Sequence, residues 1–443
     1  MNNERKKVWS QAFIRGVKES DDAIVSISKE LNISETLAIL LYNRGYRSAV
    51  EAKKFICYET ANLNDPFLLN DMDLAVERIK KAVENNEKIY IYGDYDVDGV
   101  TSVSMLYLYL SSLGADVGIK IPKRDTEGYG ISCESVKLMA EEGTKLIVTV
   151  DTGITAAEEI EYAAELGIDV VITDHHKCRS ELPPAVAVVN PHREDSTYPF
   201  CELAGVGVAF KLICAIETRL CEMRGEPVID GIRRVIYEYA DLAAIGTIAD
   251  VMPLVDENRL IVGIGLKQIM DTKRCGLAAL IEAASVNKNG SETQNTKKKK
   301  ITSSFIGYGI APRINAAGRI SDAMIAVRLL LCDNKEEAQK AGYKDTPASL
   351  TFPTLMNFWG YPEIWNRMTE IGIDIKKLLH AKEEYEYFSP IYPGDVITGK
   401  VKVDSMRASS AMDMVTFKSV YCRDGEEVLV AKMTIVVPKG ENA

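Results

Sequence analysis

The feature that most constrains the fold of this chain is a series of short apolar segments that stop at acidic or histidine residues. These segments are KIYIY (88–92), KLIVTV (145–150) and DVVIT (169–173), and stretches with helical spacing separate them. Apolar strands that alternate with helices are typical of a parallel sheet covered by helices on both faces. The sequence therefore predicts an α/β fold with a doubly wound parallel sheet.

The length of 443 residues exceeds what one hydrophobic core usually supports, so we expect more than one domain. The polar, lysine-containing segment 286–304 is expected to be a loop, and one helix is expected around 363–377 among long β-like runs. We predict three parts, with the second junction at about 330–345: a helical lead-in over 1–80, the doubly wound domain over 81–335, and a smaller α+β domain over 336–443.

The composition excludes several classes of protein. Hydrophobic residues make up 47% and charged residues 26% of the chain, which argues against a disordered or fibrous protein. No apolar run approaches the ~20 residues of a membrane helix, and the first residues lack the apolar core of a secretory signal. We therefore expect a soluble cytoplasmic protein that does not bind membranes. Because the net charge is −11, any phosphate-bearing partner must be attracted by a local positive field.

Three aspartates follow the first apolar segment directly. In an extended segment the side chains at i, i+2 and i+4 point the same way, so Asp94, Asp96 and Asp98 are expected to converge. A solvated acidic turn is the alternative. Convergent carboxylates repel one another unless cations neutralise them, and oxygen ligands suit Mg²⁺ and Mn²⁺. The pattern therefore predicts a site for divalent metal.

Further candidate ligands stand where other apolar segments end. Asp151 follows KLIVTV, Asp174-His175-His176 follows DVVIT, and we group Asp250 with these strand ends because it follows the apolar run AAIGTIA. Ligands of open α/β sheets bind outside the carboxyl ends of the strands, so these residues are expected to share one rim. Five of these aspartates, Asp94, Asp96, Asp98, Asp151 and Asp250, carry about five negative charges, and two divalent cations would nearly neutralise them. Two-metal sites suit the hydrolysis of phosphoesters or phosphoanhydrides.

The same segments resemble a known superfamily. GDYDVDGVTS, VDTGIT, DHH and GTIADVMPL, in this order, are similar to the four metal motifs of the DHH phosphoesterases. The flanking segments RGYRSAVEAKKF, LNDPFLLNDMDLAVERI, EGYGIS, LAGVGVAFKL and APRINAAGRI resemble the RecJ-type single-stranded-DNA-specific exonucleases over about residues 35–340. This resemblance implies an exonuclease that uses two Mn²⁺ or Mg²⁺ ions and degrades single-stranded DNA or short oligonucleotides from the 5′ end.

The resemblance also implies roles for individual residues. Asp151 would bridge two metal ions and His176 would face the scissile phosphate, with Asp98 also at the reacting centre. The implied metal ligands are Asp94, Asp96, Asp98, Asp151, His175 and Asp250. The implied substrate contacts are Arg124, Glu127, Tyr129, Arg313, Asn315 and Arg319, of which the last three would contact phosphate or brace the rim. His192 is expected to lie in a supporting loop rather than on a metal.

The last part of the chain resembles another family. AGYKDTPASLTFPTLMNFWG, LLHAKEEYEYFSPIYPGDVITGKVKV and DGEEVLVAKMTIVVP are similar to the N-terminal hot-dog domain of MaoC-like acyl dehydratases, over about 336–438. Such dehydratases need a catalytic Asp and His, and His380 stands at a position that is not catalytic in that family. The resemblance therefore implies a non-catalytic hot-dog tail, which would pair with a second copy or with a partner hot-dog subunit.

Three functions are compatible with these observations. The first is a two-metal exonuclease with a non-catalytic tail, and the intact set of ligands favours it. The second is a phosphodiesterase of the same superfamily that acts on small substrates such as nanoRNA or cyclic dinucleotides. The third is an acyl-thioester-binding or assembly module whose α/β part is an inactive passenger. Substrate length preference separates the first two.

Overall fold

The computed structural model describes residues 18–57, 63–122, 128, 130–285, 301–320, 322–332, 364–370, 379–389, 391, 395–409 and 412–438. Three helices come first: α1 (Lys18–Leu31), α2 (Glu35–Asn43) and α3 (Ala49–Ile56). Ser48 caps α3 in a capping box with Glu51, which satisfies backbone N–H groups at the start of the helix. The three helices bury a small cluster of their own that includes Ile27 and Leu41.

The predicted doubly wound parallel sheet is confirmed. Its strands are β1 (Lys88–Gly93), β2 (Val117–Lys120), β3 (Thr144–Val150), β4 (Asp169–Thr173) and β5 (Ala187–Val189), all parallel, in the order β2-β1-β3-β4-β5. The chain moves outward in opposite directions from β1 and β3, so the crevice between these two strands is a topological switch point. Gly93 pairs with Val150 at the carboxyl end, so the residues that follow both strands meet there.

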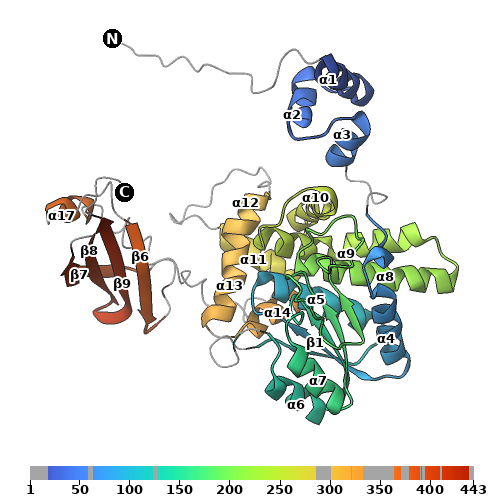
Figure 1. Ribbon diagram of the computed structural model, residues 1–443. Helices are drawn as coiled ribbons and strands as arrows, with labels where there is room; N and C mark the ends of the chain where they lie inside the picture. The colour runs from blue at the N-terminus through green and yellow to red at the C-terminus, as the bar shows by residue number, and fades with distance from the viewer. Residues whose placement is uncertain are drawn as a thin grey trace.

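Helices cover both faces of this sheet (Figure 1). Alternate residues of the strands point to opposite faces, so Ile89 and Ile91 of β1 enter one core whereas Tyr92 enters the other. The larger core lies against α4 (Met72–Glu84), α5 (Val97–Ser112), α8 (Gly205–Arg224) and α9 (Val228–Ala249). The smaller core lies against α6 (Cys133–Glu141) and α7 (Ala157–Glu165).

Further helices extend the larger core. They are the 3-10 turn η2 (Pro66–Leu68), α10 (Asp256–Met270), α11 (Cys275–Ser285), α12 (Ser303–Phe305), the π-helical turn η3 (Ile306–Ile310), α13 (Ala311–Ile320) and α14 (Met324–Leu331). Most of the predicted loop 286–304 lies outside the described residues, and its last two residues begin α12. The helices of the described ranges include none that is both long and apolar enough to span a bilayer.

The predicted second fold is also confirmed, as a separate antiparallel sheet. Its strands are β6 (Leu379–Tyr387), β7 (Ile397–Ala408), β8 (Met412–Arg423) and β9 (Glu426–Pro438), in the order β6-β9-β8-β7. Asp424 and Gly425 join β8 to β9 with φ of 53° and 86°, which are the two left-handed residues of a tight hairpin turn. Helix α17 (Ile364–Glu370) lies within the predicted helix 363–377 and packs Met368 against Phe417 and Ile435.

One element differs from its prediction. We grouped Asp250 with the strand ends, but the run AAIGTIA is the last part of helix α9, and Asp250 is its C-cap. A short apolar run cannot be assigned to a strand or a buried helix from periodicity alone. Here α9 is 22 residues long and buried along most of its second half, so its helical period is hidden by apolar residues on every side.

Candidate metal centre

The turn from β1 into α5 carries three aspartates in three different backbone settings. Asp94 follows β1, Asp96 caps α5 by accepting a hydrogen bond from Gly99 N at 3.0 Å, and Asp98 lies in the first helical turn. The segment is therefore not extended, and the reasoning from an extended i, i+2, i+4 pattern was wrong. A β-carbon at Gly99 would lie 2.3 Å from Asp94 O, so this tight turn requires glycine.

Asp98 is buried and held by the start of another helix. Its Oδ2 accepts a hydrogen bond from Gly205 N at 2.7 Å, and its Oδ1 accepts one from Val206 N at 2.9 Å. Burial raises the pKa of Asp98 well above its ordinary value, and the charges of Asp96 and Asp250 add to this, against the two N–H donors. The N-terminus of α8 thus fixes the position of the Asp98 carboxylate, but its negative charge remains unfavourable in this buried, acidic site.

Asp151 follows β3 in a left-handed backbone conformation, with φ of 57°. Such a φ is uncommon for any residue with a side chain, and strained backbone of this kind is often found at functional sites. Its Oδ1 lies 3.2 Å from Nε2 of His175. A β-carbon at Gly205 would lie 2.5 Å from Asp151 Oδ1, so the close approach of α8 to this carboxylate depends on glycine.

The segment after β4 is organised by Asp174, which is buried. Its Oδ1 accepts hydrogen bonds from His175 N at 2.7 Å and His176 N at 3.0 Å, and its Oδ2 accepts one from Ile154 N at 3.0 Å. Nδ1 of His176 lies 2.7 Å from the same Oδ1, so the carboxylate orients the imidazole ring. Although burial alone would raise the pKa of Asp174, its bonds to His176 and to backbone N–H groups lower it.

The pKa values of the two histidines are shifted in opposite directions. Burial lowers the pKa of His175 to about 4, so its imidazole is neutral near pH 7 and its lone pair is available to a metal. The hydrogen bond with Asp174 raises the pKa of His176, and the side chain of His176 is about half exposed. Burial raises the pKa of Asp250 to about 6, with a further contribution from Asp96.

These side chains bring their potential ligand atoms into three overlapping groups. Within each group the atoms lie within 4.8 Å of one another: Asp94, Asp96 and Asp151; Asp98, His175 and Asp250; and Asp151, His175 and His176. Asp151 and His175 each belong to two groups. Nε2 of His175 lies 3.8 Å from both Asp98 Oδ2 and Asp250 Oδ2, which brings the end of α9 to the ends of β1 and β4.

The chemistry of this set fits divalent cations. Asp94 Oδ1 and Asp151 Oδ1 are buried and accept no hydrogen bond from the described residues. Burial raises the pKa of Asp94 to about 7, and the neighbouring charge of Asp96 adds to this. Buried carboxylates that repel one another and lack donors are unfavourable alone, whereas a divalent cation would supply both the positive charge and the ligand bonds that they lack. The site can therefore hold more than one such ion.

The structure places the other predicted residues less completely. Arg313 donates a hydrogen bond from Nη1 to Gly309 O at 2.6 Å, and Asn315 is half-buried in α13. The remaining predicted substrate contacts lie outside the described residues, or have side chains outside them: Arg124, Glu127, Tyr129 and Arg319. The side chains of His380, Trp359 and Trp365 in the tail are likewise not described.

Two residues support the site from outside the three ligand groups. One is Asp174, which the sequence analysis placed among the strand-end candidates and which orients His176. The other is Asn190, which is buried, donates from Nδ2 to His176 O at 2.9 Å and accepts from His192 N at 2.7 Å. His192 therefore lies in a supporting loop and belongs to none of the three ligand groups, which were drawn from the described residues. The position of Asn190, directly after the apolar strand β5, is the sequence signal that could have identified it.

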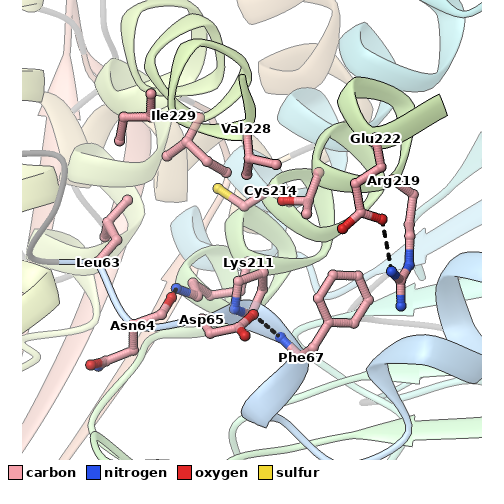
Figure 2. Close-up of a pocket in the computed structure, with 13 residues that line it drawn as sticks. Leu63, Asn64, Asp65, Phe67, Lys211, Cys214, Arg219, Glu222, Val228 and Ile229 are labelled. Carbon is pink, nitrogen blue, oxygen red and sulfur yellow. Dashed lines mark hydrogen bonds and ion pairs between the residues drawn. The ribbon is translucent and has the colours of Figure 1, made fainter. Parts of the chain in front are cut away.

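A separate cavity of about 570 Å³ lies between the η2 segment and helices α8 and α9 (Figure 2). Its polar groups already have partners. Lys211 Nζ lies 2.8 Å from Glu257 Oε1, Arg219 Nη1 lies 2.8 Å from Glu222 Oε2, and Asp65 accepts a hydrogen bond from Phe67 N. Since these charged groups already have partners, the described residues of the cavity offer no comparable set of ligands for a cation. The candidate metal ligands lie in the carboxylate and histidine cluster.

Comparison with known proteins agrees with this geometry. Residues 88–247 match the DHH family, N-terminal domain, and residues 329–431 match the FAS1-like, dehydratase domain region. The chain is 43% identical over 323 residues to the single-stranded-DNA-specific exonuclease RecJ of Bacillus subtilis (strain 168), covering 73% of this chain and 38% of that protein. It is 38% identical over 302 residues to RecJ of Escherichia coli (strain K12), covering 68% of this chain and 50% of that protein.

Two solved structures are similar to the described fold. A crystal structure of exonuclease RecJ bound to manganese aligns with a TM-score of 0.52 and 38% identity, over 62% of this chain and 64% of that one. RecJ of Thermus thermophilus in complex with Mn²⁺ aligns with a TM-score of 0.58 and 33% identity, over 72% of this chain and 42% of that one. The chain spans about half, or less, of the length of its curated relatives. Residues 88–247 thus match a DHH family domain within a longer stretch that is similar to the RecJ exonucleases, and residues 329–431 match a FAS1-like dehydratase region.

Proposed function

We propose that this chain hydrolyses phosphodiester bonds with two divalent cations, Mn²⁺ or Mg²⁺, and that it removes nucleotides from the 5′ end of single-stranded DNA. The observation that carries this proposal is the position of Asp151, which belongs to one ligand group with Asp94 and Asp96 and to another with both histidines. Its buried Oδ1 accepts no hydrogen bond within the described residues. The names of its relatives, single-stranded-DNA-specific exonucleases, and the manganese bound to two of them support the same reaction.

The residues divide between two metal positions. Asp94 and Asp96 would hold one ion, His175, Asp98 and Asp250 would hold the other, and Asp151 would serve both. When bound, the two ions supply Lewis acidity toward water and toward the oxygens of the phosphate. The chain itself keeps His175 neutral by burial and fixes Asp98 through the N–H groups of α8.

His176 is the proposed contact with the scissile phosphate. Its ring is oriented by Asp174 and is partly exposed, so it faces the side from which a substrate must approach. Because Asp174 raises the pKa of His176, the imidazole holds a proton more readily and can donate a hydrogen bond to a phosphate oxygen. Asn190 stabilises this arrangement by donating a hydrogen bond from Nδ2 to the backbone oxygen of His176.

For the whole chain we propose the division stated from the sequence, with a helical lead-in over 1–80, the nuclease part over 81–335 and a tail over 336–443. The tail is proposed to be non-catalytic and to pair with another hot-dog domain. Sheet β6-β9-β8-β7 supports this, because a sheet of this kind leaves edge strands on which a second sheet can form.

A digestion assay tests the nuclease proposal. Single-stranded and double-stranded oligonucleotides of graded length, labelled at the 5′ or the 3′ end, are incubated with the protein in Mn²⁺ or in EDTA. We expect mononucleotide release from the 5′ end of single strands in Mn²⁺ only. Cleavage confined to the shortest oligonucleotides of the series would replace the proposal with the small-substrate phosphodiesterase.

The matched variants are Asp151→Asn and His192→Ala. Asparagine tolerates a left-handed φ, so Asp151→Asn removes the charge without disturbing the backbone. His192→Ala removes a side chain close to the cluster but outside the ligand groups, and it keeps the backbone bond to Asn190. Loss of most activity in the first variant and little in the second supports the assignment, whereas equal activity of Asp151→Asn and the parent at saturating Mn²⁺ refutes it.

A further inference from the structure

We propose that Tyr308 is a platform on which a nucleobase of the substrate stacks beside the metal centre. The inference rests on the proposed function, because it assigns a substrate contact to that same site. The position of Tyr308 in the fold carries the inference together with its exposure, because single exposed aromatic side chains are common on protein surfaces.

Tyr308 stands at the middle of the π-helical turn η3, between α12 and α13. The N–H of Ala311 donates to Ile306 O, which is the i→i+5 bond of a π-helix. Ile306 and Ile310, at the two ends of the turn, are fully buried, whereas Tyr308 is 86% exposed. Turns of this kind occur frequently at functional sites. The ends anchor the turn in the core, and its middle presents an aromatic ring to solvent.

The neighbours of Tyr308 leave its ring accessible. The side-chain positions of the flanking Gly307 and Gly309 face Ile248 and Phe305, and not the Tyr308 ring. Within the described residues, the ring makes no hydrogen bond and no contact with another ring. An exposed ring without such partners gives a planar molecule an open approach.

The turn is attached to the segment that delivers a metal ligand. A β-carbon at Gly307 would lie 3.8 Å from Ile248 Cγ2, and Ile248 precedes the candidate ligand Asp250 by two residues. The guanidinium of Arg313 binds the same turn through Gly309 O at 2.6 Å, which places a positive charge beside it. On this proposal, a single strand whose phosphate lies at the metal centre would pass this cation and this exposed ring on the Asp250 side.

Stacking on a tyrosine ring does not depend on which base is present, because every base has a π-face. It suits an enzyme that degrades strands of any sequence. Replacing such a ring by alanine weakens binding by about 5- to 150-fold per base.

The test compares Tyr308→Ala, Tyr308→Phe and the control Tyr237→Ala, which removes a comparably exposed tyrosine from α9. Binding of a dye-labelled oligothymidylate with phosphorothioate linkages is measured by fluorescence anisotropy in Mn²⁺. We expect Kd to rise at least fivefold in Tyr308→Ala and to stay within twofold of the parent in the other two. An oligonucleotide that is abasic near its 5′ end should remove the difference between the parent and Tyr308→Ala.

Kinetics separate stacking from damage to the metal centre. For the normal oligonucleotide, KM should rise in Tyr308→Ala, whereas the parent and this variant should have equal kcat and KM for the oligonucleotide that is abasic near its 5′ end. Equal binding by the parent and Tyr308→Ala, or equal loss in Tyr308→Phe, would overturn the inference. A parent that binds the oligonucleotide with the expected difference but hydrolyses no phosphodiester would contradict the proposed function alone.

Discussion

Two neighbouring positions of the metal centre each accept very few residue types. Asp151 has a left-handed φ, which favours glycine, asparagine or aspartate, and of these only aspartate supplies a carboxylate. Gly205 must lack a β-carbon because Asp151 Oδ1 occupies the space at 2.5 Å. The backbone conformation and the metal-binding chemistry therefore both limit which residue types these two positions accept. One position follows β3 and the other begins α8.

The first prediction at this scale concerns the residue that orients His176. Asp174→Asn keeps the size of the side chain but removes the charge that holds the imidazole proton, so the pKa of His176 should fall. We expect kcat to drop by about 10- to 100-fold, the usual effect of losing an outer hydrogen-bond partner. Steady-state kinetics and NMR titration of the histidines measure the two effects. Glu165→Gln, at the exposed end of α7, is the control, and an Asp174→Asn variant with unchanged kcat would contradict the role of Asp174.

The second prediction concerns pH in the absence of metal. Burial raises the pKa of Asp94 to about 7 and that of Asp250 to about 6, above the ordinary value of 3.8. The folded state therefore binds protons more tightly than the unfolded state, and these groups make the protein less stable as pH rises from about 4 to 7. In EDTA, Tm should fall between about pH 4 and pH 7, and saturating Mn²⁺ should reduce that fall. A fall that is equally large in the Asp94→Asn/Asp250→Asn variant would show that other groups cause it.

At the scale of elements, the sequence predicted the sheet well and the helices around it less well. The apolar runs of β1, β3 and β4 end where the sequence indicated, because a central parallel strand is apolar on both faces and stops abruptly. Asp250 was placed at a strand end and belongs to α9, since a helix buried on all sides shows no period. The supporting role of Asp174 was missed because its contact with Ile154 N depends on how β3 and β4 are paired, and Asn190 was missed because its contact with His176 O depends on how β4 and β5 are paired.

The prediction at this scale concerns the ion pair that joins α8 to α10. Lys211 and Glu257 are both buried and lie 2.8 Å apart, and Glu257 also accepts hydrogen bonds from Asn64 N and Tyr198. Lys211→Met leaves a buried carboxylate without its cation and should lower the free energy of unfolding by about 3–5 kcal/mol. Urea denaturation measures this change.

The neighbouring pair Lys54–Asp256 provides the control. Its side chains are 44% and 33% exposed, so Lys54→Met should cost less than about 1 kcal/mol. Adding Glu257→Gln to Lys211→Met should recover part of the lost stability, because the uncompensated charge is then removed. Similar unfolding midpoints for Lys211→Met and Lys54→Met would contradict this account of the pair.

At the scale of the whole molecule, two sheets of opposite character occur in one chain. The first is parallel and covered on both faces, whereas the second is antiparallel and has β7 at its edge within the described sheet. Strand β7 is twelve residues long and largely exposed, with Val403 at 47% and Met406 at 59% exposure. A long edge strand with exposed apolar side chains favours pairing with another strand.

We therefore predict that the full chain is a dimer in solution at micromolar concentration, through its tail. Light scattering after size-exclusion chromatography measures the mass. Val403→Lys/Met406→Lys on β7 should shift the protein toward the monomer of 49.0 kDa, because each charge would be desolvated at a paired edge. The control Met223→Lys changes an exposed methionine of α8 and should leave the mass unchanged. A parent chain that is already monomeric would rule out pairing between copies.

The hydrogen bonds from the start of α8 to Asp98 have a practical consequence. The two oxygens of the Asp98 carboxylate accept hydrogen bonds from the backbone amides of Gly205 and Val206, and one oxygen of this carboxylate is a candidate for coordination. Any cation that draws electron density from these oxygens weakens the two amide bonds, and any loss of the cation strengthens them. The solvent exchange and chemical shifts of these two amides thus form an intrinsic reporter of metal loading, readable without substrate and without turnover.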